Sequence, residues 1–145
     1  MNREAIYKAL FAKLESIEQL TTASRILQHW DDVSPNQQPA LFMCNDTQNA
    51  EQVTGFPSKY KLGAKVWIYC HRDTNGIVPA AQVNDILDAI DEALRPLPSP
   101  VNSQTLGGLV HHCWVDGPIE TDEGTLGLQS VAIVPISMLV VNAQP

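Results

Sequence analysis

Apolar residues recur at helical spacing in two segments of the chain. Between Arg3 and Gln19 they follow one another at intervals of three or four residues, which predicts an amphipathic helix. The same pattern begins after Pro79, a residue suited to the first turn of a helix, and ends at the prolines of Arg95–Pro100. The apolar positions are Ile6, Leu10, Leu14 and Ile17 in the first helix and Val83, Ile86, Leu87, Ile90 and Leu94 in the second.

The remaining apolar segments predict β-strands. The clearest is Ala64–Arg72, which is rich in aromatic and β-branched residues. The order α-β-β-β-α-β-β predicts a single domain, 1–145, with an α+β fold. We expect a mostly antiparallel β-sheet, two amphipathic helices and a long C-terminal β-hairpin. The other expected strands are Ser24–Trp30, Ala40–Asp46, Gly108–Val115 and Leu128–Val141.

Both faces of the expected sheet are apolar. In the Ala64–Arg72 strand, Trp67 and Tyr69 share one face, and Val66, Ile68 and Cys70 share the other. An antiparallel sheet with one face in water should instead alternate apolar and polar residues. We therefore expect the second face to be covered by Gly55–Leu62 folding back, by another subunit, or by a thicker monomer core. Pro135 cannot donate a ladder hydrogen bond and indicates an edge or a bulge.

The chain is acidic and carries few charges. Its 145 residues are 44% hydrophobic and 17% charged, with a net charge of −7. The basic residues are scattered, and only Lys59, Lys61 and Lys65 lie close together in the sequence. This distribution argues against a protein that grips a nucleic-acid backbone. The low charge favours a surface that a partner partly covers.

The sequence predicts a soluble protein without a membrane partner. The N-terminal residues have no apolar signal core, and the longest apolar run, Val131–Val141, is interrupted and too short to cross a bilayer. The 3 cysteines are widely spaced and form no CxxC motif. An odd number of such cysteines predicts reduced thiols in a cytosolic setting.

No residue pattern announces catalysis or a metal site. Cys70–His71 and His111–Cys113 are neighbours on expected strands, so adjacent side chains point to opposite faces and cannot easily share an ion. The chain has no G-x-S-x-G motif, and the glycines of Thr105–Leu109 lack the lysine of a phosphate-binding loop. We therefore expect no catalytic residue, metal ligand or cofactor. A small cytosolic enzyme that uses its Cys and His residues is the alternative from another functional class.

The stretch "DGPIETDEGTLG", Asp116–Gly127, places four carboxylates and three glycines before the last strand. It does not match a calcium loop, because Pro118 and Thr121 occupy the third and sixth positions. Nothing apolar beside it would raise a carboxylate pKa for acid/base work. We expect a long hairpin connection, or two strand extensions with an acidic tip, whose role is contact with a partner.

The stretch "QTLGGLVHHCWVDGPIETDEGTLGLQSVAIVPISMLV", Gln104–Val140, resembles the C-terminal β-hairpin of phage tail terminator proteins. These proteins of long-tailed phages are also called tail completion or minor tail proteins. Upstream, "KVWIYCHRD" followed by "QVNDILDAIDEAL" resembles the central strand and second helix of the family. The N-terminal helix and the hairpin after it also fit, so the resemblance covers nearly the whole chain.

The resemblance implies a virion structural protein rather than an enzyme. Family members form a ring, typically of six subunits, that caps the head-proximal end of the tail tube, stops its polymerisation and offers the head–tail joining surface. The implied partners are other copies of the chain, the major tail tube protein and a connector or neck protein. DNA passes through the lumen without specific binding, and an acidic lining would repel it. The implied location is the virion tail, and the host cytoplasm during assembly.

A closed ring joins two different patches on neighbouring subunits. We expect the aromatic sheet face to pack against an apolar edge or helix of the next subunit, through Trp67, Tyr69 and Trp114. The expected docking elements for the tail or neck are the 55–61 loop and the 116–126 hairpin. Their residues are Phe56, Lys59, Tyr60, Lys61, Glu120, Asp122 and Glu123. A head-completion or head–tail adaptor protein of the neck is the alternative within the virion.

Overall fold

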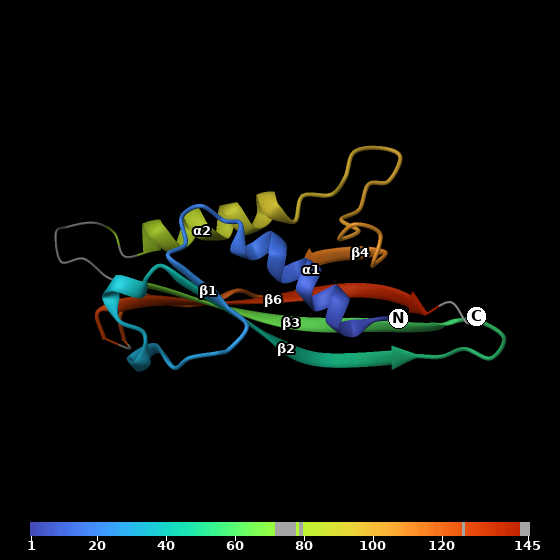
Figure 1. The fold of residues 1–145 in the computed structure, drawn as a ribbon, viewed down its shortest axis with the longest axis horizontal. Helices are drawn as coiled ribbons and strands as arrows, with labels where there is room; N and C mark the ends of the chain where they lie inside the picture. The colour runs from blue at the N-terminus through green and yellow to red at the C-terminus, as the bar shows by residue number, and fades with distance from the viewer. Residues whose placement is uncertain (72–77, 79, 126, 143–145) are drawn as a thin grey trace.

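A β-sheet runs the length of the molecule, and both α-helices lie on one of its faces (Figure 1). The computed structural model describes residues 1–71, 78, 80–125 and 127–142. The elements are α1 (Arg3–Glu15), β1 (Thr22–Ser24), the short 3-10 helices η1 (Trp30–Asp32) and η2 (Pro35–Gln37), β2 (Ala40–Glu51), β3 (Ser58–His71), α2 (Ala80–Ala93), β4 (His112–Val115), β5 (Glu120–Asp122) and β6 (Gln129–Asn142).

The 6-stranded sheet has the order β1-β2-β3-β6-β4, and β5 also pairs with β6. β1 and β2 are parallel, whereas the β2–β3, β3–β6, β4–β6 and β5–β6 pairs are antiparallel. The longest ladder joins β3 to β6, from Ser58 opposite Asn142 to His71 opposite Gln129. This arrangement confirms the predicted α+β fold, its mostly antiparallel sheet and the order of its elements.

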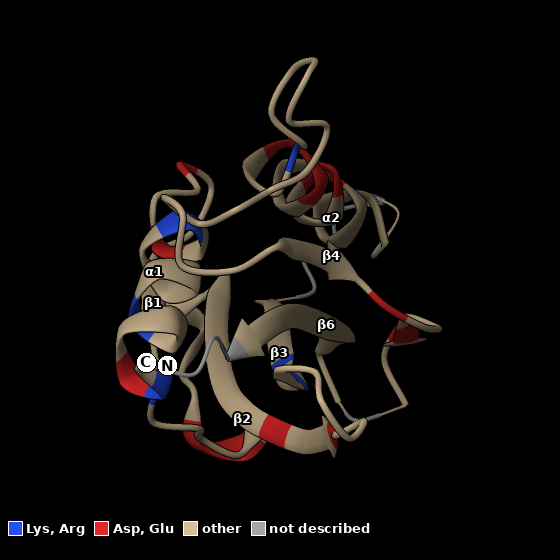
Figure 2. Ribbon diagram, turned by 90° about the vertical axis from the view of Figure 1, so that its right-hand side faces the viewer, with Lys and Arg blue, Asp and Glu red and all other residues tan. Residues whose placement is uncertain are grey.

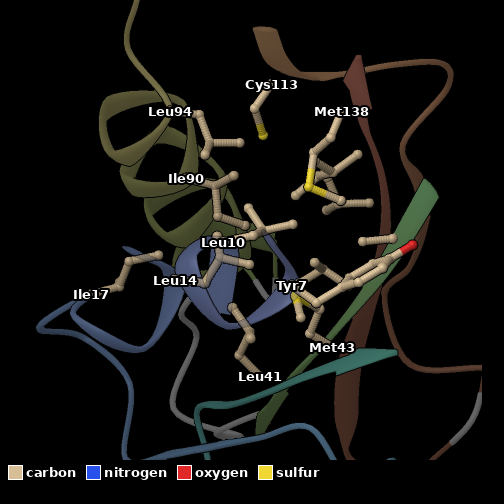
Figure 3. Packing of buried hydrophobic residues seen from close by; sticks show 14 of the residues in the cluster. Tyr7, Leu10, Leu14, Ile17, Leu41, Met43, Ile90, Leu94, Cys113 and Met138 are labelled. Atoms are coloured by element: carbon tan, nitrogen blue, oxygen red, sulfur yellow. The ribbon is translucent and has the colours of Figure 1, made fainter. Parts of the chain in front are cut away.

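The two helices bury their apolar faces against the sheet, as their sequence pattern predicts. The side chain of Asn2 caps α1 by accepting the amide N–H of Ala5 at 3.0 Å. Tyr7 of α1 donates its hydroxyl to the carbonyl of Gly63 on β3 at 2.7 Å, which ties the helix to the sheet. Figure 3 shows the resulting core between α1, α2 and the strands. It includes Leu10, Leu14, Ile17, Leu41, Met43, Ile90, Leu94, Cys113 and Met138.

A second, smaller apolar cluster lies on the opposite face of the sheet. The segment between β1 and β2 crosses this face and places Val33 against Phe42, Tyr69 and Val131. One end of the second face is therefore covered by the chain itself, as the thicker-core alternative requires. The Gly55–Leu62 segment does not fold back, because it forms the turn of the β2–β3 hairpin and the first residues of β3.

The predicted strand Ser24–Trp30 is wrong in its extent. Only Thr22–Ser24 pairs with β2, and the chain then leaves the sheet. Local side-chain hydrogen bonds stabilise the irregular backbone that follows Ser24. The amide of Ile26 donates to Ser24 Oγ at 3.0 Å, and the amide of Asp31 donates to His29 Nδ1 at 3.2 Å. Such short-range bonds give the backbone partners outside the sheet.

The β2–β3 hairpin is longer than the apolar pattern indicated. Both strands continue through polar residues, so Asn49 pairs with Lys61 and Glu51 with Lys59 close to the turn. The ladder is made by backbone groups, and opposite charges facing each other across the strands favour it. The hairpin therefore projects beyond the helices at one end of the sheet (Figure 1).

Pro135 lies in β6 at the point where the neighbouring strand on one side changes from β4 to β5. Its carbonyl accepts the amide of Asp116 at 2.9 Å, so its ring nitrogen also faces the side of β6 on which β4 ends and β5 begins. The missing donor thus falls in a break between two partner strands, which agrees with the irregularity that the proline predicts. The short strand β5 lies within Asp116–Gly127, where we expected either a hairpin connection or two strand extensions.

Candidate functional site

A pocket opens on the second face of the sheet beside the covered end. It has a volume of about 200 Å³ and an apolar floor that includes Trp67 and Ile133. We call it the Trp67 pocket; its lining residues are Trp30, Trp67, Glu120, Thr121, Asp122, Val131 and Ile133. Trp67 and Ile133 face each other across the β3–β6 ladder and are both half-buried. Sequence reasoning singled out Trp67 and the acids but not Trp30 or Ile133.

The indole nitrogen of Trp67 is buried without a hydrogen-bond acceptor among the described residues. An unsatisfied buried donor costs on the order of 1–3 kcal/mol. The residue nevertheless packs against the cluster of Val33, Phe42 and Tyr69, which holds the ring in place. The Trp67 pocket therefore combines exposed apolar surface with a buried indole N–H that finds no acceptor in the described part of the chain.

Two carboxylates form the acidic rim of the Trp67 pocket. Strand β5 places Glu120 opposite Ile133 and Asp122 opposite Val131. Asp122 Oδ1 accepts the amides of Gly124 at 2.9 Å and Thr125 at 2.8 Å, which shapes the turn that follows β5. The predicted acidic stretch is thus a strand extension with a turn. Its last acid, Glu123, lies exposed in that turn.

The opposite end of the sheet carries an exposed apolar surface on the β2–β3 hairpin. Val53 is 53% exposed and Phe56 is 68% exposed, although both are large apolar residues. A shallow cavity of about 280 Å³ lies beside them. We call this region the hairpin tip; its lining residues are Glu51, Val53, Phe56, Pro57, Lys59 and Val141. Sequence reasoning found Phe56 and Lys59 but missed Val53, whose exposure no local pattern reveals.

Tyr60 and Lys61 are not loop residues, in contrast to the predicted 55–61 docking loop. Both belong to β3, where Tyr60 pairs with Val140 and Lys61 with Leu139. Tyr60 packs against the helix-side core, and the guanidinium carbon of Arg3 lies 5.2 Å from its ring centroid. Of the four docking residues named in this segment, Phe56 and Lys59 line the hairpin tip, and Lys59 also belongs to β3.

A polar cluster links Lys61 to the far side of β6. The Nζ of Lys61 lies 2.6 Å from Asp116 Oδ2 and 5.9 Å from the ring centroid of Trp114. Ser137 donates its hydroxyl to the same carboxylate oxygen at 2.8 Å. The hydrogen bonds from Lys61 and Ser137 lower the pKa of Asp116 from 3.8, because they favour the carboxylate form.

The three residues of the predicted subunit interface share one sheet face but differ in exposure. Tyr69 is only 1% exposed, because the segment between β1 and β2 covers it and its hydroxyl donates to the Gln28 carbonyl at 2.8 Å. Burial raises its pKa to about 12. Trp114 is half-buried and stacks on His112, with ring centroids 5.2 Å apart. Trp67 and Trp114 are therefore available to a neighbour, whereas Tyr69 is not.

The cysteines and histidines do not form a reactive group in the described part of the chain. Burial raises the pKa of Cys70 and of Cys113 to about 12, which keeps both thiols protonated at neutral pH. His112 Nδ1 accepts the amide of Gln104 at 3.1 Å. Among the described residues, no three His, Cys, Asp or Glu side chains lie close enough to hold a metal ion.

Within the same residues, no helix has the length and apolar character that a bilayer crossing requires. Charged residues are distributed unevenly over the ribbon (Figure 2). Helix α2 carries four acids, which are Asp85, Asp88, Asp91 and Glu92. Basic residues occur on α1 and β3.

Comparison with known proteins identifies no family. No family model matches the chain, and no curated protein matches its sequence. Among solved structures, a protein whose designation states no function aligns over 99% of this chain and 94% of its own length. The two sequences are 20% identical and the TM-score is 0.48, so this similarity carries no functional inference.

Proposed function

We propose that this chain is a ring-forming tail terminator, a virion structural protein that caps the head-proximal end of a phage tail tube. In this role it stops tube polymerisation and provides the surface to which the head joins. The resemblance of Gln104–Val140 to the family hairpin supports the proposal. The structural observation that favours it is an exposed apolar tip at one end of the sheet and an open apolar pocket at the other.

Surfaces of this kind suit a ring rather than a symmetric dimer. Subunits that associate through two different patches repeat the same contact until the ring closes. The half-buried Trp67 and Trp114 lie on the sheet face that would meet a neighbour. Aromatic residues are enriched at such interfaces, because they bury a large area at a small cost in side-chain entropy.

The acids would serve the passage of DNA and the contacts with the tube and neck. A net charge of −7 repels a nucleic-acid backbone, so DNA could pass a lumen lined with acids without being retained. Glu120, Glu123 and the acidic side of α2 are exposed and are available for this role or for contact with a basic partner surface.

The proposal is tested by adding the chain to the purified major tail tube protein of the same phage during tube assembly. Electron microscopy should show tubes of reduced length with extra density at one end. Tube lengths that stay unchanged over a range of chain concentrations would overturn the terminator proposal. Binding to the head connector without any effect on tubes would identify a neck adaptor instead.

Mass in solution provides a second test. Light scattering of a ring of six copies should give about 95 kDa, against 15.9 kDa for the single chain. A concentration series with and without magnesium shows whether the ring forms before it meets a tube. The ring should be insensitive to chelators, because the proposed contacts need no metal ion.

A further inference from the structure

We infer that the hairpin tip of one copy inserts into the Trp67 pocket of a second copy. The inference specifies the subunit contact of the proposed ring and rests on that proposal. It is based on three features of the two surfaces, which are their apolar character, their charge and their positions at opposite ends of the sheet. It assigns the hairpin tip to a neighbouring subunit rather than to the tail tube.

The apolar parts of the two surfaces match in size. The ring of Phe56 is 68% exposed at the end of a projecting hairpin. The Trp67 pocket has a volume of about 200 Å³ and an apolar floor of Trp67, Val131 and Ile133. A cavity of about 150 Å³ accepts benzene, so this pocket has room for one phenyl ring. Insertion would remove apolar surface of both copies from water.

The charges of the two surfaces are complementary. Lys59 is exposed beside Phe56 and makes no ion pair among the described residues, although Glu51 lies opposite it on β2. The rim of the Trp67 pocket carries Glu120 and Asp122, and Glu120 is also exposed without an ion pair there. A lysine next to the inserted ring would meet this acidic rim, which favours one orientation of the contact.

The two surfaces cannot meet within one chain. Strand β3 runs from Ser58 at the hairpin tip to Trp67 at the pocket, about 30 Å at roughly 3.3 Å per residue. Figure 1 shows the hairpin turn at one end of the sheet and η1, which carries Trp30, near the other. The contact therefore has to join different copies, and a head-to-tail repeat of it gives a ring or an open filament.

A mixing experiment tests this head-to-tail contact. Phe56→Asp should disable the tip and leave the pocket intact, whereas Glu120→Lys should disable the rim and leave the tip intact. Each variant alone should lose the association of the parent chain, with a dissociation constant raised about tenfold or more. The mixture should form dimers and nothing larger, because only one productive contact is possible. Sedimentation velocity separates these species.

A charge exchange between Lys59 and Glu120 tests the proposed ion pair directly, and a matched surface variant serves as the control. Lys59→Glu and Glu120→Lys should each weaken association, and the chain that carries both should recover the parent affinity to within about threefold. Ile26→Asp is the control, because Ile26 is 77% exposed and lies at neither surface. Its association should equal that of the parent.

Parent-like association of Phe56→Asp and Glu120→Lys would overturn the inference, as would a mixture that gives no dimer. A parent chain that stays monomeric at about 1 mM, where a contact of millimolar dissociation constant is populated, would also overturn it. The tube-capping assay is independent of these results. Shortened tubes together with unaffected tip variants would retain the terminator proposal and reject only the subunit contact.

Discussion

Lys61 and Asp116 form an ion pair across an intervening strand. Nζ of Lys61 on β3 lies 2.6 Å from Oδ2 of Asp116, which follows β4, and β6 runs between these two strands. Ser137 of β6 donates to the same oxygen at 2.8 Å, so the pair is connected to the strand it crosses. The cluster thus fastens the β4 edge of the sheet to the β2–β3 hairpin.

Replacing Lys61 by Met should weaken the protein slightly and in a pH-dependent manner. Both side chains are partly exposed, so we expect a loss of at most about 1 kcal/mol in the free energy of unfolding at neutral pH. The folded-state pKa of Asp116 lies below 3.8, so the contribution of the pair is present above that value and disappears as the pH falls through the folded pKa.

Urea titrations between pH 3 and pH 7 check this expectation. The difference between the parent and Lys61→Met should be constant near neutral pH and should shrink in acid. Lys65→Met is the matched control, since Lys65 lies on the same strand and the same sheet face. If both variants lost the same free energy of unfolding at every pH, the Lys61–Asp116 pair would make no specific contribution to stability.

Tyr69→Phe should lower stability by about 0.5–1.5 kcal/mol, because it removes the 2.8 Å hydrogen bond to the Gln28 carbonyl. The pKa of Tyr69 is raised from 10.0 to about 12, so its contribution is complete below pH 10 and is lost as the pH rises toward 12. The phenolate absorbance of the folded parent should therefore include a tyrosine that ionises late. The variant should lose this late contribution and keep that of Tyr7, whose pKa burial also raises.

The helices and the central strands could be predicted from the sequence because their apolar spacing reports burial directly. Leu10 and Leu14 recur at helical spacing and are fully buried, as is Ile68 in β3. The polar ends of the β2–β3 hairpin could not be predicted in this way. Residues such as Asn49 and Lys61 are held in the sheet by backbone hydrogen bonds, and the hydrophobicity pattern of a sequence contains no information about such bonds.

The candidate surfaces could be predicted only in part. The sequence indicated that Trp67 lies on an apolar second face, but the distinction between half-buried Trp67 and fully buried Tyr69 depends on where the 25–39 segment crosses. That crossing is a long-range contact with no local signal. The pairing of Glu120 with Ile133, which puts an acid beside the Trp67 pocket, depends equally on strand register.

The thiols offer a test of the enzyme alternative. Cys44 is half-exposed, whereas Cys70 and Cys113 are buried with pKa values of about 12. A thiol reagent at neutral pH should modify Cys44 first and should reach the other two only after global unfolding. Rapid modification of Cys70 or Cys113 in the folded chain would instead indicate an accessible, activated thiolate.

The same buried thiols should make the protein less stable in alkali. Unfolding lets Cys70 and Cys113 lose their protons near the ordinary thiol pKa of 9.0, whereas the folded chain keeps both protonated up to about pH 12. The free energy of unfolding should therefore fall as the pH rises above 9. The variant Cys70→Ala/Cys113→Ala should show a shallower fall, measured as the slope of stability against pH.

Core and surface truncations should separate folding from assembly. Leu10→Ala removes a side chain that is 0% exposed and should cost about 2–5 kcal/mol of unfolding free energy. Phe56→Ala removes a ring that is 68% exposed and should change the stability of the monomer by no more than about 0.5 kcal/mol. Thermal unfolding at low concentration measures both, and a large loss for Phe56→Ala would show that its ring packs within the chain.

Gly63 lies where β3 passes the bulge of β2, and alanine there should destabilise the fold. A Cβ atom at this position would lie 2.7 Å from the carbonyl oxygen of Thr47, within the register shift between Asn45 and Gln48. Because this neighbour is backbone, a strand has to move, and overpacking of this kind costs about 1–3 kcal/mol. Movement of Gly63 would also strain the 2.7 Å hydrogen bond from Tyr7 to its carbonyl.

Urea midpoints of the parent, Gly63→Ala and Tyr7→Phe, together with the double variant, measure this coupling. If the methyl group displaces the Gly63 carbonyl, the hydrogen bond is already weakened in Gly63→Ala, and the double variant should lose less than the sum of the single losses. Lys65→Ala is the control, because it shortens a side chain on the same face of β3. An unchanged midpoint for Gly63→Ala would mean that the β2 bulge absorbs the methyl group by local movement, and α1 would then be anchored to a more deformable strand than the 2.7 Å approach indicates.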